Sequence, residues 1–188
     1  VKGLSGASSK DREIWMEFHT DWESLAVESE LLLTAKLKEV PRDVVNSAET
    51  FEGETEGQQT TKVRLAQRFF RKTILASYEG QCCVTGLTVP SLLVASHILP
   101  WSDYPEHRVN PSNGLCLNNL MDKAFDCGLV AFDKDGRLML SRELKSRTHD
   151  EAINRCFLPY SGVKLKRPSK FQPLDEFLAK HRESRFQG

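Results

Sequence analysis

The sequence predicts an α+β protein, in which an N-terminal helical arm precedes a domain of short strands and helices. Apolar residues recur at spacings of three and four over residues 10–39 and again over residues 62–79, which indicates two amphipathic helices. After Gly80 the apolar segments become short, as in strands that alternate with turns. The first of them, at residues 82–86, indicates a strand that runs into a turn, and Leu174, Phe177 and Leu178 indicate a last short helix. Two of these segments flank Lys134-Asp135-Gly136, a typical hairpin turn.

The arm and the domain are expected to be separate parts of the chain. Ser8 and Asp11 have the spacing of a capping box at the start of the first helix, and Pro41 ends that helix. The residues that follow are acidic, polar and without periodicity, which indicates a linker. The predicted parts are an arm (residues 1–45), an acidic linker (46–61) and a domain (62–188).

Composition excludes several classes of protein. Hydrophobic residues make up 39% of the 188 residues and charged residues 28%, which is typical of a folded chain. The apolar runs are shorter than the roughly 20 residues of a membrane span, so no membrane association is expected. Five Cys without a secretory signal indicate free thiols in a reducing compartment, and we expect a cytoplasmic protein. Because the chain begins with Val1, we also expect a further region upstream.

The net charge of zero hides an asymmetry. Residues 1–61 carry 6 basic and 13 acidic side chains, whereas residues 62–188 carry 20 basic and 13 acidic ones. The basic part predicts a polyanionic partner, although attraction between the two parts of one fold accounts for the split equally well. Five cations lie on one side of the predicted helix 62–79, which is either a phosphate-binding surface or a solvated face. These cations are Lys62, Arg64, Arg68, Arg71 and Lys72.

The chemistry is concentrated in a predicted strand–loop–strand–helix unit. His97 ends one apolar segment, Asn113 precedes the next, and Asp122 and Asp126 lie one turn apart on a short helix. This order brings an imidazole, an amide and two carboxylates to one place. Each residue also has a structural interpretation: a hydrogen-bonded core histidine, a carboxylate at a helix N-terminus, or a partner for a nearby cation.

Five phrases in this part of the chain, taken in order, resemble the HNH endonucleases, and in particular a bacterial restriction-type subfamily. The resemblance is strong over residues 62–140, with the core motif at residues 82–140, and weaker at residues 11–15. The phrases are Gln67–Arg71, Cys82–Gly86, Ala95–Trp101, Asn110–Leu117 and Asp122–Leu129.

The resemblance implies a ββα-metal fold that hydrolyses phosphodiester bonds of double-stranded DNA, in bacterial restriction or defence. His97 then corresponds to the general base on water, and Asn113 (or Asn110) to the residue that orients the loop. Asp122 corresponds to a metal ligand, with Asp126 as a secondary candidate. Oxygen ligands favour one divalent ion, Mg²⁺ or Mn²⁺ more than Zn²⁺.

Two positions depart from the family pattern. Ser96 stands where relatives often have a metal-binding Asp or His, and Met121 stands where many have a His. Ser96 is a weaker ligand and Met121 a poor one for a hard cation. The alternatives are therefore a catalytically degenerate DNA-binding module of the same fold, or a domain that only binds other proteins. A ββα finger reads few bases, so target specificity is expected from an upstream region or from a second copy in a homodimer.

Overall fold

The computed structural model describes residues 6–38 and 58–188. The chain forms two compact units, residues 1–69 and 70–188. None of the described helices is long and apolar enough to cross a membrane.

The first unit contains α1 (Ser9–Phe18), α2 (Trp22–Lys38) and the beginning of α3 (Gln58–Ser77). The predicted capping box is confirmed, because Ser8 Oγ accepts a hydrogen bond from Asp11 N and the Asp11 carboxylate accepts one from Ser8 N. The single helix predicted over residues 10–39 is wrong. The first helix ends at Phe18, and a new helix begins at Trp22. The new helix has an N-terminal cap, because Asp21 Oδ1 accepts a hydrogen bond from Ser24 N at 3.0 Å.

The predicted linker is shorter than expected at its C-terminal end. Helix α3 begins at Gln58, so the last four residues of the segment 46–61 are helical. Residues 39–57 lie outside the described part of the chain. At its other end α3 stops close to the predicted residue, and Gly80 has a φ of 63°, which favours glycine.

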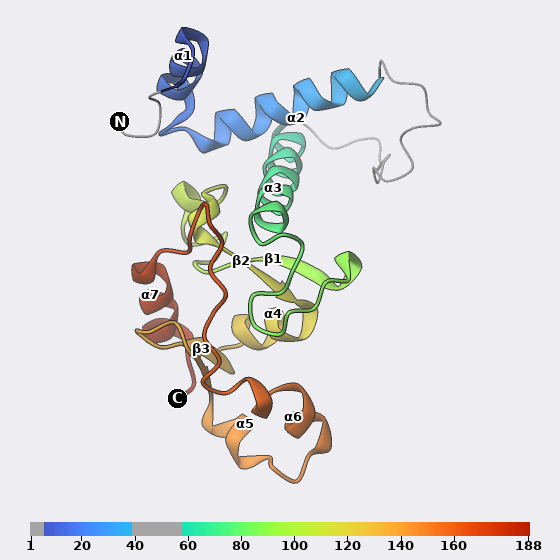
Figure 1. Ribbon diagram of the computed structural model, residues 1–188, viewed down its shortest axis with the longest axis vertical. Coiled ribbons are helices and arrows are strands. Elements are labelled where there is room, and N and C mark those ends of the chain that lie inside the picture. Colours follow the sequence, from blue (N-terminus) through green and yellow to red (C-terminus); the bar gives the residue numbers. More distant parts are fainter. Residues whose placement is uncertain (1–5, 39–57) are drawn as a thin grey trace. The chain divides into compact units, whose positions relative to one another are not determined.

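The centre of the second unit is an antiparallel pair of strands followed directly by a helix (Figure 1). Strand β1 (Leu93–His97) pairs with β2 (Gly114–Asn118) in a register that sets His97 opposite Gly114. Helix α4 (Asn119–Asp126) begins at once, because the side chain of Asn118 accepts a hydrogen bond from Met121 N at 2.9 Å. The α+β class is therefore confirmed.

The C-terminal half of α3 packs directly on β2, and Gly114 makes this possible. A Cβ atom at Gly114 would lie 2.2 Å from Ile74 Cδ1 and 2.8 Å from Phe70 Cζ. Phe70 and Ile74 are both buried and belong to the core of the unit. A side chain at position 114 would therefore push both of these residues away from the end of β1, where His97 lies.

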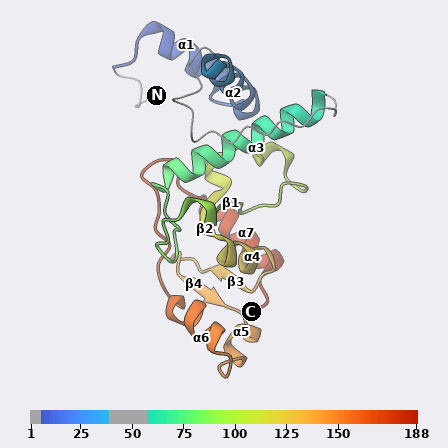
Figure 2. The same cartoon turned by 90° about the vertical axis from the view of Figure 1, so that its right-hand side faces the viewer.

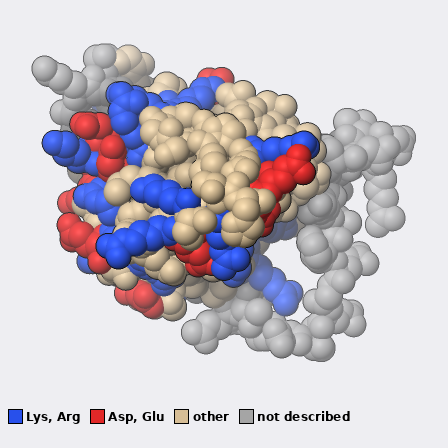
Figure 3. Space-filling model, turned by 90° about the horizontal axis from the view of Figure 1, so that it is seen from below, with Lys and Arg blue, Asp and Glu red and all other residues tan. Residues whose placement is uncertain are grey.

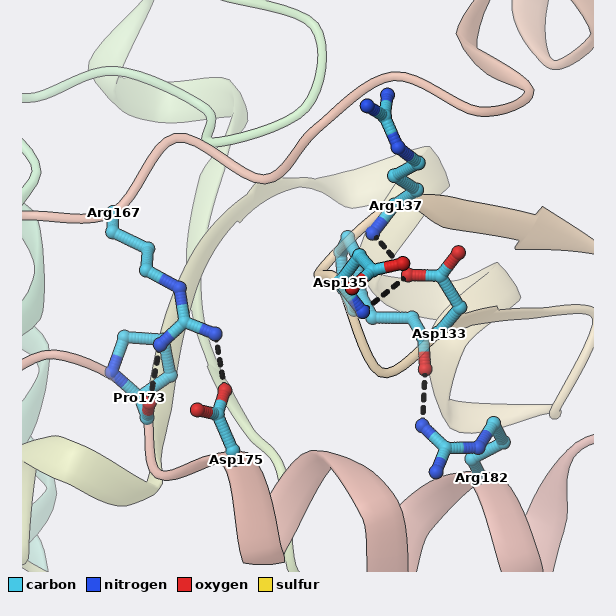
Figure 4. A network of polar contacts seen from close by, with 8 residues as sticks. Asp133, Asp135, Arg137, Arg167, Pro173, Asp175 and Arg182 are labelled. Atoms are coloured by element: carbon cyan, nitrogen blue, oxygen red, sulfur yellow. Dashed lines mark hydrogen bonds and ion pairs between the residues drawn. The ribbon is translucent and has the colours of Figure 1, made fainter.

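A second sheet follows. Strands β3 (Val130–Phe132) and β4 (Leu138–Leu140) form the predicted hairpin, and Asp133 closes its turn by accepting hydrogen bonds from the backbone N–H groups of Asp135 and Arg137 (Figure 4). Figures 1 and 2 both show this hairpin between α4 and the helices α5 (Arg142–Ser146) and α6 (Glu151–Cys156).

The remaining elements differ in part from expectation. Helix α7 (Asp175–Arg185) is the predicted last helix, whereas α5 and α6 were not predicted. Of the strand and turn predicted at residues 82–86, only the turn forms, and in it Gly86 N donates to Cys82 O at 3.0 Å. Short 3-10 turns occur at Pro90–Leu92, Pro105–His107, Pro111–Asn113 and Leu158–Tyr160.

Candidate active site

A cleft of about 490 Å³ opens in the second unit, where the end of β1 meets one face of α4. Ser96 and His97 line it from β1, and Asp122 and Asp126 line it from α4. The structure thus brings together four residues that the sequence singles out, with the two carboxylates one helical turn apart.

The ring of His97 is held in one orientation. Its Nε2 lies 2.7 Å from the carbonyl oxygen of Arg108, and because a carbonyl only accepts, Nε2 is the donor. In the neutral ring the lone pair is then on Nδ1. One face of the ring stacks on Phe70 at 3.9 Å between centroids, and Trp101 meets it edge-on at 5.4 Å. The orientation and the tautomer are therefore both determined.

The surroundings of His97 favour the neutral form of its ring. Burial lowers the pKa of His97, while the hydrogen bond to Arg108 and the negative charge of Asp126 oppose this change. Burial has the largest effect, so the pKa lies below the ordinary value of a histidine. A neutral imidazole with a free Nδ1 is the form that accepts a proton.

Asn113 holds the loop that follows β1. Its Oδ1 accepts a hydrogen bond from Leu99 N at 2.8 Å, and its Nδ2 donates to the carbonyl oxygens of Leu99 and His107, each at 3.2 Å. The side chain is almost fully buried. Asn110, the other candidate for this position, instead accepts a hydrogen bond from Ser112 N and caps a short turn.

The acidic side of the cleft disfavours the ionised form of Asp122. Burial raises the pKa of Asp122, and the negative charge of Asp126 raises it further, while Ser96 and Lys123 oppose the shift. The hydroxyl of Ser96 is buried and, within the described part of the chain, makes no hydrogen bond of standard geometry, although its interaction with Asp122 lowers the pKa of that carboxyl. A hard cation would satisfy both groups.

The donor set fits one kind of ion better than another. Among the described residues, no three His, Cys, Asp or Glu side chains converge as the ligands of a metal. A zinc ion with a complete shell of protein ligands therefore does not fit. A Mg²⁺ ion fits, because it retains several waters and needs only one or two carboxylates beside the substrate phosphate.

The two departures from the family pattern have different structural meanings. Met121 is 1% exposed and belongs to the hydrophobic core, so it does not fill the cleft. Ser96 does line the cleft, beside the carboxylates. Of the two positions, only 96 offers a side chain to a ligand in the cleft.

The predicted basic side of α3 is not a set of free cations. Within the first unit, Arg68 pairs with the buried carboxylate of Glu30 in α2 at 3.7 Å. Within the second unit, Arg71 donates to the carbonyl oxygens of Leu93 at 2.8 Å and Pro90 at 3.4 Å. Arg64 and Lys72 are exposed, and the side chain of Lys62 lies outside the described residues.

The end of the second unit that carries α5 and α6 is also of mixed charge. Figure 3 shows Lys and Arg side chains there among Asp and Glu. Arg147 pairs with Glu143, and Arg155 with Glu151, each one helical turn apart. No uniform basic surface is present on this face.

Two further residues, which the sequence did not indicate as site residues, also line the cleft. His181 and Arg185 both come from α7, more than 50 residues beyond α4. Their spacing of four along a helix was visible in the sequence, but nothing local indicated which element that helix contacts.

The comparison with known families agrees with this geometry. Residues 82–133 match the family model of the HNH endonucleases. No curated protein matches the chain. The matched segment includes β1, β2 and α4, and with them His97, Asn113 and both carboxylates. The match supports the HNH endonuclease family for this segment of the chain, and with it a nuclease.

Proposed function

We propose that the second unit is a metal-dependent endonuclease that hydrolyses phosphodiester bonds of double-stranded DNA. The observation that carries this proposal is the cleft itself, in which a neutral, oriented His97 faces a pair of carboxylates inside an HNH match. The restriction-type phrases around these residues support a role in bacterial restriction or defence.

In this reaction His97 Nδ1 takes a proton from a water molecule. The water oxygen attacks the phosphorus, the bond from phosphorus to the leaving oxygen breaks, and that oxygen takes up a proton from solvent water to leave as a hydroxyl group. Asp122, with Asp126 and Ser96, would hold a divalent ion, Mg²⁺ or Mn²⁺, which when bound supplies Lewis-acid stabilisation of the phosphate charge. Asn113 holds the loop through Leu99 and His107, and so keeps the Arg108 carbonyl in position to orient His97.

A second function is favoured by two observations. Ser96 replaces a stronger ligand, and no three metal-binding side chains converge among the described residues. A domain that retains the fold and binds DNA without cutting it would have this appearance.

Incubation of supercoiled plasmid with the protein separates the two functions. We expect nicked or linear product with Mg²⁺ or Mn²⁺ and none with a chelator. His97→Ala should lower the cleavage rate by about 10²–10⁴-fold, the usual contribution of a general base. Asp122→Ala should abolish metal-dependent cleavage. His149→Ala removes an exposed histidine that lies between α5 and α6, and this variant is the matched control.

Each outcome has a distinct meaning. A salt-sensitive gel shift without cleavage would favour the DNA-binding module. Undiminished cleavage by a well-folded His97→Ala protein would remove His97 from the mechanism. Absence of both cleavage and DNA binding would contradict the proposed function.

A further inference from the structure

We infer that Arg185, at the end of α7, is a phosphate-binding residue of the cleft and contacts the backbone of the bound DNA. The inference rests on the proposed function and adds a residue that lies outside the HNH match at residues 82–133.

Arg185 lines two neighbouring hollows in the surface of the second unit. It lines the cleft that contains His97 and Asp122, and also a neighbouring hollow of about 380 Å³. The two hollows share Pro100 and His181 as well, so Arg185 stands where one passes into the other. A nucleic acid strand with its phosphate at His97 that follows both hollows would pass this point.

The backbone around Arg185 is fixed by a close approach to the turn after α4. A Cβ atom at Gly128 would lie 2.0 Å from the Arg185 carbonyl oxygen, and Gly128 has a φ of 70°, so only glycine suits this position. Just beyond, Gln187 N donates to Gly128 O at 2.9 Å, and Gln187 Nε2 donates to Cys127 O at 2.7 Å.

The rest of α7 is anchored as well (Figure 4). Arg182 Nη1 donates to Phe132 O at 2.8 Å, at the end of β3. Before the helix, Arg167 donates to the carbonyl oxygen of Pro173 and pairs with Asp175. These contacts hold α7 at both ends, so the position of Arg185 does not depend on its own side chain.

The guanidinium of Arg185 is available for an anion. Nη1 donates to the carbonyl oxygen of Asp126 at 3.2 Å, a bond that uses one of five N–H donors. No carboxylate forms an ion pair with it within the described residues, unlike Arg147, Arg155 and Arg167. The side chain is exposed at the cleft rather than covered.

The two carboxylates of the cleft make a cationic side chain favourable for phosphate binding. Asp122 and Asp126 repel a phosphodiester. Among the described residues that line the cleft, Lys123 and Arg185 are the only lysine and arginine. Lys123 offers a point charge from α4. Arg185 offers a planar fork that matches two phosphate oxygens. A phosphate held by Arg185 would offset the repulsion from the carboxylates.

The test is the salt dependence of duplex DNA binding by the full chain, measured by fluorescence anisotropy in chelator so that no cleavage occurs. We expect Arg185→Gln to weaken binding about tenfold or more and to reduce the slope of log K against log salt by about one. Arg185→Lys should keep the slope and recover part of the affinity. Arg147→Gln, which removes an exposed arginine that follows α5 directly, should match the wild type.

The outcomes separate this inference from the proposed function. Wild-type binding together with an unchanged affinity and slope in Arg185→Gln would overturn the role of Arg185 and leave the nuclease proposal intact. An equal loss in Arg147→Gln would also overturn it, because it would reflect net charge alone. A wild-type protein that neither binds nor cuts DNA would overturn both.

Discussion

At the scale of single residues, the site depends on two contacts between a side chain and the backbone, one made by His97 and one by Asn113. The carbonyl of Arg108 decides which nitrogen of His97 carries the proton, and Asn113 holds the loop in which that carbonyl lies. Asn113 satisfies both polar groups of the Leu99 backbone at once. The loop conformation requires this buried side chain, because water does not reach the backbone groups that are hydrogen-bonded to Asn113.

Asn113→Ala therefore should lower stability and activity together. It leaves buried backbone groups of Leu99 without partners, at a cost of about 1–3 kcal/mol for each unsatisfied group. Asn110→Ala, the control, removes only a side-chain cap of a short turn, at a cost of about 1 kcal/mol. Urea unfolding and plasmid cleavage measure both variants. Equal effects of the two substitutions would contradict the role given to Asn113.

At the scale of elements, one face of α4 lines the cleft and another face packs in the core. Met121, Ala124 and Phe125 are buried in the core, whereas Asp122 and Asp126 line the cleft. The spacing of four keeps both carboxylates on one face. A residue at position 121 is consequently directed away from the ligands, whatever its chemistry.

The family pattern taken alone predicts that Met121→His preserves or raises cleavage, whereas the burial of position 121 predicts no gain. We expect Met121→His to bury an imidazole in the core, to lower the free energy of unfolding by about 1–3 kcal/mol, and to leave metal-dependent cleavage no faster. Met121→Leu keeps the volume and should cost less than about 1.5 kcal/mol. Urea unfolding and cleavage rates decide, and faster cleavage by Met121→His would contradict the orientation of α4.

At the scale of the whole molecule, a buried histidine links stability to pH. Burial lowers the pKa of His181 to about 4, the charge of Arg185 acts in the same direction, and the hydrogen bond to Phe125 opposes them. Its ring stacks on Phe125 at 3.6 Å. The unfolded chain binds a proton here near pH 6.5, whereas the folded one does not until about pH 4. The free energy of unfolding therefore falls as the pH falls through this window.

His181 should contribute about 3 kcal/mol to that loss, from 1.36 kcal/mol for each unit of pKa difference. The difference in unfolding free energy between neutral and mildly acidic pH should be smaller in His181→Gln than in the wild type. His149→Gln, at an exposed position, is the control and should retain the wild-type pH dependence. Urea unfolding over a pH series measures it. An unchanged pH dependence in His181→Gln would place the titration elsewhere.

The sequence alone determined those features that depend on neighbours a few residues apart. The capping box at Ser8, the Asp-Gly turn of the β3–β4 hairpin and the spacing of Asp122 and Asp126 on one helix face are all local. The break between α1 and α2 is local as well, and the pair Asp21 and Ser24 would have revealed it. The prediction of one helix over residues 10–39 rests on apolar periodicity alone, which continues across this capping pair.

Only the tertiary structure decided the contacts that join distant parts of the chain. Glu30 meets Arg68 although no acidic residue lies near Arg68 in sequence. The absence of a side chain at Gly128 matters only because the end of α7, more than 50 residues away, comes to lie there and brings Arg185 to the cleft. Periodicity shows that a helix has an apolar face, but the surface which that face covers depends on complementary packing of the whole unit.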